Sequence, residues 1–208
     1  MTLMKTAAIV ATIAATAIAS PASAQRVVDT KGFYVGGGLN ASSIKIDDSD
    51  IGDSDRESGG GFYFHAGWNF TPRLGAFIGG AAANISADDG NDFLLGHADL
   101  GGRLSFPGAS SFLPYIEVAI TAVSAEDEFE DQDVELSGTG ATGAAGFNYF
   151  LSQKVALDLN VRYTVGEFNT VKIGDISISN DDGIGMNTAR INLGLAYYPF
   201  AGQRSRVR

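Results

Sequence analysis

Residues 155–165 read VALDLNVRYTV, and this stretch decides the class of fold. Apolar residues occupy every second position, and residues such as Asp158 and Arg162 lie between them. Alternation with a period of two is typical of a β-strand that has one apolar face and one polar face. We therefore expect an all-β chain.

Seven further segments carry the same kind of pattern: residues 32–44, 60–70, 74–86, 95–106, 115–123, 136–151 and 188–200. Segment 74–86 is so rich in Gly and Ala that its facing stays open. Short connections (71–73, 107–114 and 152–154) alternate with long polar ones (47–59, 87–92, 125–135 and 166–187). This alternation predicts an eight-stranded antiparallel up-and-down β-barrel with both chain ends on the side of the short turns.

The composition supports this fold class and excludes several functions. The 208 residues include 27 Gly, an excess that disfavours helices and suits a crowded barrel interior. There is no Cys, which excludes disulfides, thiolate catalysis and Cys-based metal sites. The formal net charge of -10 argues against a nucleic-acid partner, which requires a basic surface.

The first 24 residues have the features of a secretory signal peptide. Lys5 precedes a short apolar stretch at 6–18, and Ala22-Ser23-Ala24 supplies a cleavage site of the A-x-A type. We expect cleavage before Gln25. The remaining chain then divides into a short segment (25–31), the barrel (32–200) and a basic C-terminal tail (201–208).

The residues between the apolar positions decide which face of the barrel is outside. A soluble barrel, the alternative, would expose this polar face and would carry Lys and Glu there. The polar faces of the strands with a clear pattern carry no Lys, and Arg forms desolvated, bidentate pairs with carboxylates. The residues expected to form a hydrogen-bonded network in the lumen of a transmembrane barrel are His97, Asp99, Arg103, Glu117, Asp158, Arg162 and Arg190.

Aromatic residues gather near the short-turn ends of the apolar face. A charge at mid-bilayer costs about 2–4 kcal/mol, and the apolar face carries none where its facing is clear. Aromatic girdles mark the interfaces of transmembrane barrels. The predicted girdle consists of Phe33, Trp68, Phe70, Phe106, Tyr115, Tyr149 and Tyr197.

Four stretches together resemble the eight-stranded outer-membrane β-barrel family of the opacity-protein and OmpA-barrel type, often labelled the porin family. They are residues 32–38 (GFYVGGG), 98–104 (ADLGGRL), 147–163 and 191–200. The resemblance spans about residues 30–200 and rests on a pattern rather than on invariant residues. It differs from the family where eight residues, among them Arg204, Arg206 and Arg208, follow Phe200.

The resemblance implies a place in the outer membrane of a Gram-negative bacterium after secretory export. The loops would then be extracellular and both termini periplasmic. The implied partners are outer-membrane lipid and lipopolysaccharide, the barrel-assembly machinery acting through the C-terminal strand, and an unspecified surface or host ligand at the loops.

The four long connections hold 20 of the 24 acidic residues. Neither of the two largest acidic clusters has the spacing of an EF-hand, so we expect no cofactor and no specific metal site. Weak bridging of cations to lipopolysaccharide phosphates is one interpretation, and a solvated acidic fringe is the other. The residues that could share such cations are Asp47, Asp48, Asp50, Asp53, Asp55, Glu126, Asp127, Glu128, Glu130 and Asp131.

The expected function is non-enzymatic: a structural, envelope-integrity or surface-interaction (adhesion) role with a polar, filled lumen. A narrow porin for small solutes is the first alternative, although inward Arg and Tyr side chains leave little room in an eight-stranded barrel. A membrane-embedded enzyme acting on lipid or peptide is the second. His97 and Asp99 share a face as an acid/base pair would, but no Ser is placed as a nucleophile beside them.

Overall fold

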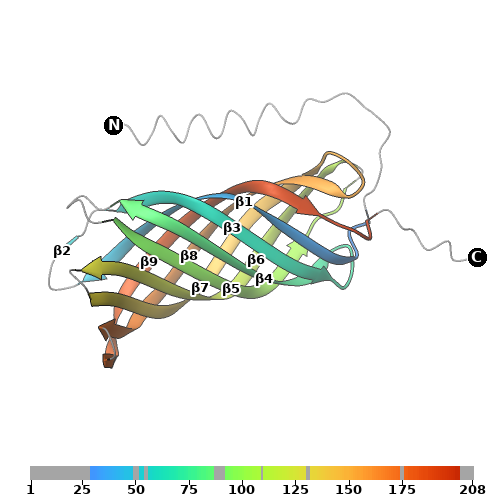
Figure 1. Cartoon of the computed structure of the whole chain (residues 1–208). Helices are drawn as coiled ribbons and strands as arrows, with labels where there is room; N and C mark the ends of the chain where they lie inside the picture. The colour runs from blue at the N-terminus through green and yellow to red at the C-terminus, as the bar shows by residue number, and fades with distance from the viewer. Residues whose placement is uncertain are drawn as a thin grey trace, which may run out of the picture.

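The computed structural model describes residues 29–48, 52–53, 56–86, 92–108, 110–129, 132–173 and 176–201. They form a single closed barrel of β-strands (Figure 1). Among these residues no helix is long and apolar enough to cross a membrane. The expected signal peptide at 1–24 and the tail from residue 202 onward lie outside the described residues.

The strands are β1 (Gly32–Asp48), β2 (Gly52–Asp53), β3 (Glu57–Asn69), β4 (Leu74–Ser86), β5 (Asp92–Ser105), β6 (Phe112–Phe129), β7 (Gln132–Phe150), β8 (Val155–Ile173) and β9 (Ile176–Tyr197). The eight long strands pair antiparallel in sequence order, and β2 adds one short pairing to the end of β1. β9 then pairs with β1 from Val35↔Tyr197 to Asp47↔Gly185. This last pairing removes the sheet edges, and it confirms the predicted eight-stranded antiparallel barrel.

The two ends of the barrel differ. At the turn end lie the connections 70–73, 106–111 and 151–154, the start of β1 and the end of β9. Two of these turns are fixed by hydroxyl groups. The Thr71 hydroxyl accepts the Leu74 N–H at 2.9 Å, and the Ser152 hydroxyl accepts the Val155 N–H at 3.1 Å. The opposite end, with the acidic connections, is called the loop end below.

At the loop end, two expected loops are largely strand. Residues 125–135 and 166–187 were expected to be polar connections, but β6 pairs with β7 as far as Phe129↔Gln132, and β8 pairs with β9 as far as Ile173↔Ile176. In 125–135 the period-two pattern is hidden because acidic residues occupy consecutive positions, whereas backbone pairing requires no apolar face. In 166–187 a short alternation is present, at Val171 and Ile173 and at Ile176 and Ile178, but polar residues and Gly surround it. β6 to β9 therefore reach beyond the end of the shorter strands as two long hairpins (Figure 1).

The facing of β4, which the sequence left open, is defined in the structure. Phe77 and Ile85 point into the lumen and are buried, whereas Leu74 and Ile78 point outward and are more than half exposed. The inward side of β4 carries no polar side chain, since its other inward positions are Gly and Ala. The strand therefore supplies an apolar inner wall on one side of the lumen.

Candidate functional site

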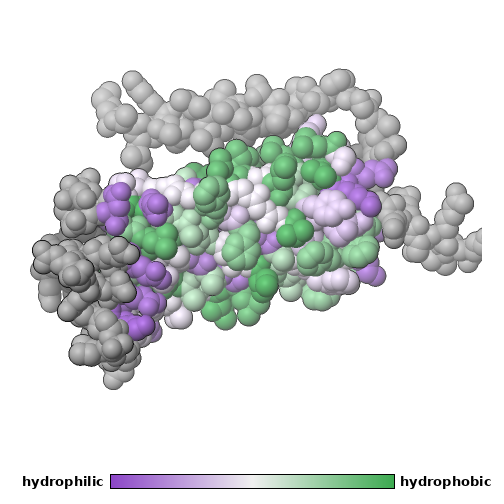
Figure 2. Space-filling view, viewed as in Figure 1, coloured by the Kyte–Doolittle hydropathy of each residue, from purple (hydrophilic) through white to green (hydrophobic). Residues whose placement is uncertain are grey.

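Large apolar side chains cover the outer surface of the barrel wall. Phe62, Val118 and Ile120 are 70–72% exposed, and many other outward residues are more than 40% exposed. Figure 2 shows hydrophobic side chains across the middle of the visible face, with hydrophilic ones toward the two ends. An apolar band of this extent requires a lipid or protein environment, because soluble monomers rarely expose contiguous apolar patches above a few hundred Å².

Six of the seven aromatic residues expected in the girdle point outward near the turn end. They are between 39% and 54% exposed: Phe33, Trp68, Phe70, Phe106, Tyr149 and Tyr197. The seventh assignment was wrong. Tyr115 is 1% exposed and lies in the lumen, because it is two residues from the inward Glu117 and so shares its face.

Five charged residues form a continuous chain of ion pairs across the lumen. On the β6 side, the Arg103 Nε donates to Glu117 Oε1 at 2.6 Å, and the Arg162 Nη2 donates to Glu117 Oε2. The Arg162 Nη1 then reaches Asp99 Oδ2 at 3.3 Å. Arg190 completes the chain with two bonds of 2.9 Å to the two oxygens of Asp99. The chain joins β5, β6, β8 and β9, and all five residues are buried.

Asp158 is held differently from the other two lumen carboxylates. Tyr63 Oη donates to its Oδ2 at 3.0 Å and Tyr115 Oη to its Oδ1 at 2.7 Å, while the Asn160 amide adds a bond of 3.0 Å. Asp158 is fully buried, and neutral donors supply its hydrogen bonds among the described residues. With Asp158 included, the three Arg and three carboxylates of the lumen sum to zero charge.

Hydroxyl and amide side chains extend the network around the lumen. Thr121 donates to Asp99 Oδ1 at 2.7 Å and also bonds to Thr142, which bonds to Thr164 at 2.7 Å. The Asn40 amide donates to Asn192 Oδ1 at 2.6 Å, which ties β1 to β9 inside the closing seam. Buried hydrogen-bonded networks of this kind fix strand register as well as satisfying polar groups.

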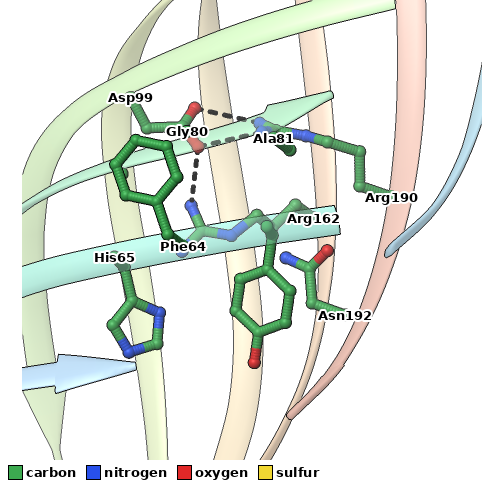
Figure 3. A pocket seen from close by; sticks show the side chains of 10 residues that line it. Phe64, His65, Gly80, Ala81, Asp99, Arg162, Arg190 and Asn192 are labelled. Atoms are coloured by element: carbon green, nitrogen blue, oxygen red, sulfur yellow. Dashed lines mark hydrogen bonds and ion pairs between the residues drawn. The ribbon is translucent and has the colours of Figure 1, made fainter. Parts of the chain in front are cut away.

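Apolar layers lie in the lumen on both sides of the network. At the turn end, Phe77, Leu113, Phe150 and Tyr198 belong to one buried cluster. At the loop end, Ile44, Ile85, Leu95, Phe168 and Met186 belong to a second. Between the layers lies a cavity of about 10 Å³, enough for one water molecule (Figure 3). Large buried side chains thus occupy the lumen through the described part of the barrel.

The two histidines do not form an acid/base pair with Asp99. His97 Nε2 lies 3.0 Å from the Thr188 hydroxyl, and both residues are buried. Asp99 takes its hydrogen bonds from Arg162, Arg190 and Thr121 instead. Asp99 therefore belongs to the ion-pair chain, and His97 is bonded to Thr188.

The acidic residues considered for cation bridging are only partly described. Glu126 lies exposed at the loop end of β6. Five of these residues lie within strands: Asp47, Asp48, Asp53, Asp127 and Glu128. Four lie outside the described residues: Asp50, Asp55, Glu130 and Asp131. Within the described part of the chain, no three His, Asp or Glu residues gather as metal ligands would.

The sequence predicts inward tyrosines, but not that Tyr115 and Tyr198 are among them or that they pack around Arg103. Arg103 has its guanidinium carbon 4.0 Å from the ring centroid of Tyr115 and 4.7 Å from that of Tyr34. Tyr34 in turn stacks on Tyr198, with the centroids 5.3 Å apart. Strand parity was the available signal, since these tyrosines fall on the same alternate positions as the polar residues.

Solved structures with this architecture come from outer-membrane proteins. Neisserial surface protein A has a TM-score of 0.61 at 17% identity, covering 83% of this chain and 99% of its own. OprG from Pseudomonas aeruginosa has a TM-score of 0.54 at 16% identity, and the match covers 80% of this chain and 95% of OprG. Ail of Yersinia pestis, in complex with the heparin analogue sucrose octasulfate, has a TM-score of 0.50 at 13% identity. The match covers 80% of this chain and 98% of Ail.

At these identities the structures show a shared fold. No curated protein sequence matches the chain significantly. The family model "Outer membrane protein beta-barrel domain" matches residues 11–198, which includes every strand of the barrel. The closed antiparallel barrel, its apolar outer band and this match agree, and the chain belongs to the outer membrane protein β-barrel domain family.

Proposed function

We propose that this barrel is a non-enzymatic protein of the Gram-negative outer membrane, with a structural and surface-interaction role. The observation that carries the proposal is the closed lumen. An ion-pair chain crosses it and a buried apolar cluster lies on each side of that chain, which disfavours transport through it and catalysis inside it. Interaction then falls to the parts that project from the membrane.

The parts that project are the β6–β7 and β8–β9 hairpins at the loop end. β9 continues from Gly185, where its pairing with β1 ends, back to Ile176. Outward apolar side chains continue past Tyr163 to Val165 on β8, which is 54% exposed, and to Ile184 on β9, which is 36% exposed. The Tyr163 hydroxyl donates to Asn187 at 3.2 Å. We place this end outside the cell, because longer loops face outward and short turns face the periplasm in bacterial barrels.

The negative charge of the loop end limits which ligands can bind there. The long connections hold 20 of the 24 acidic residues, against Arg56 and Lys172. A sulfated ligand such as the heparin analogue bound to Ail would be repelled by this surface. A cationic partner, or lipopolysaccharide phosphates bridged by shared divalent cations, is electrostatically compatible. Lipid around the barrel and the barrel-assembly machinery at β9 complete the proposed partners.

The test shortens one hairpin and removes only the β7–β8 pairings on the loop-end side of Gly138↔Phe168. The register of the β8–β9 hairpin shifts between Phe168 and Thr170. Deleting residues 170–179 removes the part of the hairpin on the loop-end side of this shift. We expect cells that display this variant to lose adhesion to wells coated with a cationic protein. The variant should keep the heat-modifiable gel mobility of a folded barrel. Arg73→Gln, at the exposed turn end, is the control and should adhere normally. Full adhesion by the folded deletion variant would contradict the proposed role of this hairpin.

A further inference from the structure

The charges of the chain separate by level along the barrel. The lumen network is neutral, and the long connections at the loop end hold 20 of the 24 acidic residues. The segments at the turn end (25–31, the three short turns and 198–208) contain seven basic residues and one acidic residue, Asp29. The seven are Arg26, Lys31, Arg73, Lys154, Arg204, Arg206 and Arg208. The turn end is therefore the cationic end of the molecule.

Three of these basic residues are described in the structure, and all three are exposed: Lys31, Arg73 and Lys154. Arg73 lies in the β3–β4 turn and Lys154 in the β7–β8 turn. Four strands separate these two turns in either direction around the closed barrel, so the two residues lie on opposite sides of it. Lys31 directly precedes β1. The cations are thus distributed around the end of the barrel rather than gathered in one patch.

The same three residues lie at the level of the aromatic girdle. Each is within three residues of an exposed apolar side chain, and these side chains are Phe33, Leu74 and Leu151, between 39% and 61% exposed. Three residues of extended chain span about 10 Å. Outward aromatic girdles mark the level of the lipid headgroups. The three cations therefore lie at this level or within about 10 Å of it.

The C-terminal tail leaves the barrel between two of these cations, because β9 lies between β8 and β1. The Tyr198 N–H donates to the Lys154 carbonyl oxygen at 2.7 Å. A Cβ on Gly32, the residue after Lys31, would lie 3.1 Å from the Phe200 ring. The seven residues that follow position 201 reach at most about 25 Å. Three of them are arginines that the chain itself keeps near the turn end: Arg204, Arg206 and Arg208.

We propose that this cationic rim, formed by Lys31, Arg73, Lys154 and the three tail arginines, binds the anionic headgroups of phospholipids in the periplasmic leaflet. Lys and Arg side chains near a membrane surface attract anionic lipids. A ring of cations at the headgroup level contacts the lipids that surround the barrel on all sides, whereas a soluble anionic partner would bind one contiguous basic patch. The inference rests on the membrane location proposed above and is independent of the adhesive role of the hairpins.

Trp68 can report which lipids lie at this rim. It is the single tryptophan, it points outward, and it pairs with Phe33, two residues from Lys31. The chain from Gln25 onward is folded into vesicles of phosphatidylcholine with a minor share of phosphatidylglycerol. Either the phosphatidylglycerol or an equal amount of the phosphatidylcholine carries bromine. Both preparations have the same surface charge and the same bromine content, so the difference in quenching of Trp68 fluorescence measures the headgroup preference at the rim.

We expect brominated phosphatidylglycerol to quench as though its local concentration were about two to five times that of brominated phosphatidylcholine. High salt should reduce this preference, because it screens exposed charges. Lys31→Gln, Arg73→Gln and Lys154→Gln together should weaken the preference. Adding Arg204→Gln, Arg206→Gln and Arg208→Gln should abolish it.

The matched control removes two lysines and one arginine from the loop end instead, through Lys45→Gln, Arg56→Gln and Lys172→Gln, and should keep the preference. Heat-modifiable gel mobility verifies that each variant is folded. Equal quenching by the two brominated lipids in the wild type, or an unchanged preference in the variant with all six rim substitutions, would overturn the inference. Absence of quenching by either lipid would overturn the membrane location together with it.

Discussion

Arg190 and Asp99 form a bidentate ion pair that joins β9 to β5 across the lumen, with both N–O distances at 2.9 Å. The two residues are 91 positions apart in sequence. Both are almost fully buried, so neither charge is hydrated and each depends on the other. The stability of the barrel should therefore respond strongly to the loss of either partner.

Arg190→Ala should destabilise the barrel by about 3–5 kcal/mol, because it leaves Asp99 buried with one Arg partner fewer. The measurement is the urea midpoint of refolded protein, followed by heat-modifiable gel mobility. Arg73→Ala, which truncates an exposed arginine in the β3–β4 turn, should leave the midpoint unchanged. Equal midpoints for the two variants would contradict the buried network.

Tyr115→Phe should destabilise by about 1.5–3 kcal/mol, the range for a hydrogen bond to a charged group. The substitution keeps the ring under Arg103 and removes only the hydroxyl that donates to Asp158 at 2.7 Å. Tyr149→Phe removes a hydroxyl from an outward tyrosine and should have little effect. If both variants unfold at the wild-type urea concentration, the assignment of Tyr115 to the lumen is wrong.

Gly67→Ala should destabilise by about 1–3 kcal/mol through overpacking. A Cβ at Gly67 would lie 2.6 Å from both the Tyr34 hydroxyl oxygen and the Ala76 carbonyl oxygen. Tyr34 cannot easily withdraw, because it stacks on Tyr198 and lies beside Arg103. Gly143→Ala should leave thermal stability unchanged, and equal melting temperatures for the two variants would show that the lumen is loosely packed at this point.

Trp68, the single tryptophan of the chain, should report the lipid interface. It points outward near the turn end with half its surface exposed. In bilayers we expect its fluorescence to be quenched by brominated lipids, more strongly when the bromines lie near the headgroups than at the bilayer centre. Efficient quenching by aqueous iodide and none by brominated lipid would contradict the outward, lipid-facing assignment.

The strand positions and facing could be predicted where polar and apolar residues alternate, as in 155–165. The membrane location could also be predicted, because the lumen face has Arg and carboxylates but no Lys. The hydrogen-bond partners of each charged residue could not be predicted. Asp158 on β8 is reached by Tyr63 from β3, across the lumen, and such a contact depends on barrel curvature and strand register rather than on spacing in sequence.

Two further features could not be predicted from the period-two alternation. The facing of β4 is set by its pairing with β3 and β5, since Gly and Ala provide no contrast between its faces. The β6–β7 extension carries acidic residues at consecutive positions, so its sequence is typical of a loop although its backbone pairs. In both cases the neighbouring strands, rather than local residue preferences, define the structure.

Single-channel recording in planar lipid bilayers shows whether ions can pass through the filled lumen. Refolded barrel, verified by its heat-modifiable mobility, is added to a bilayer in concentrated salt under an applied voltage. With the ion-pair chain and both apolar layers in place, we expect insertion without discrete conductance steps. Reproducible steps from the folded wild-type barrel would contradict the account and favour a narrow porin.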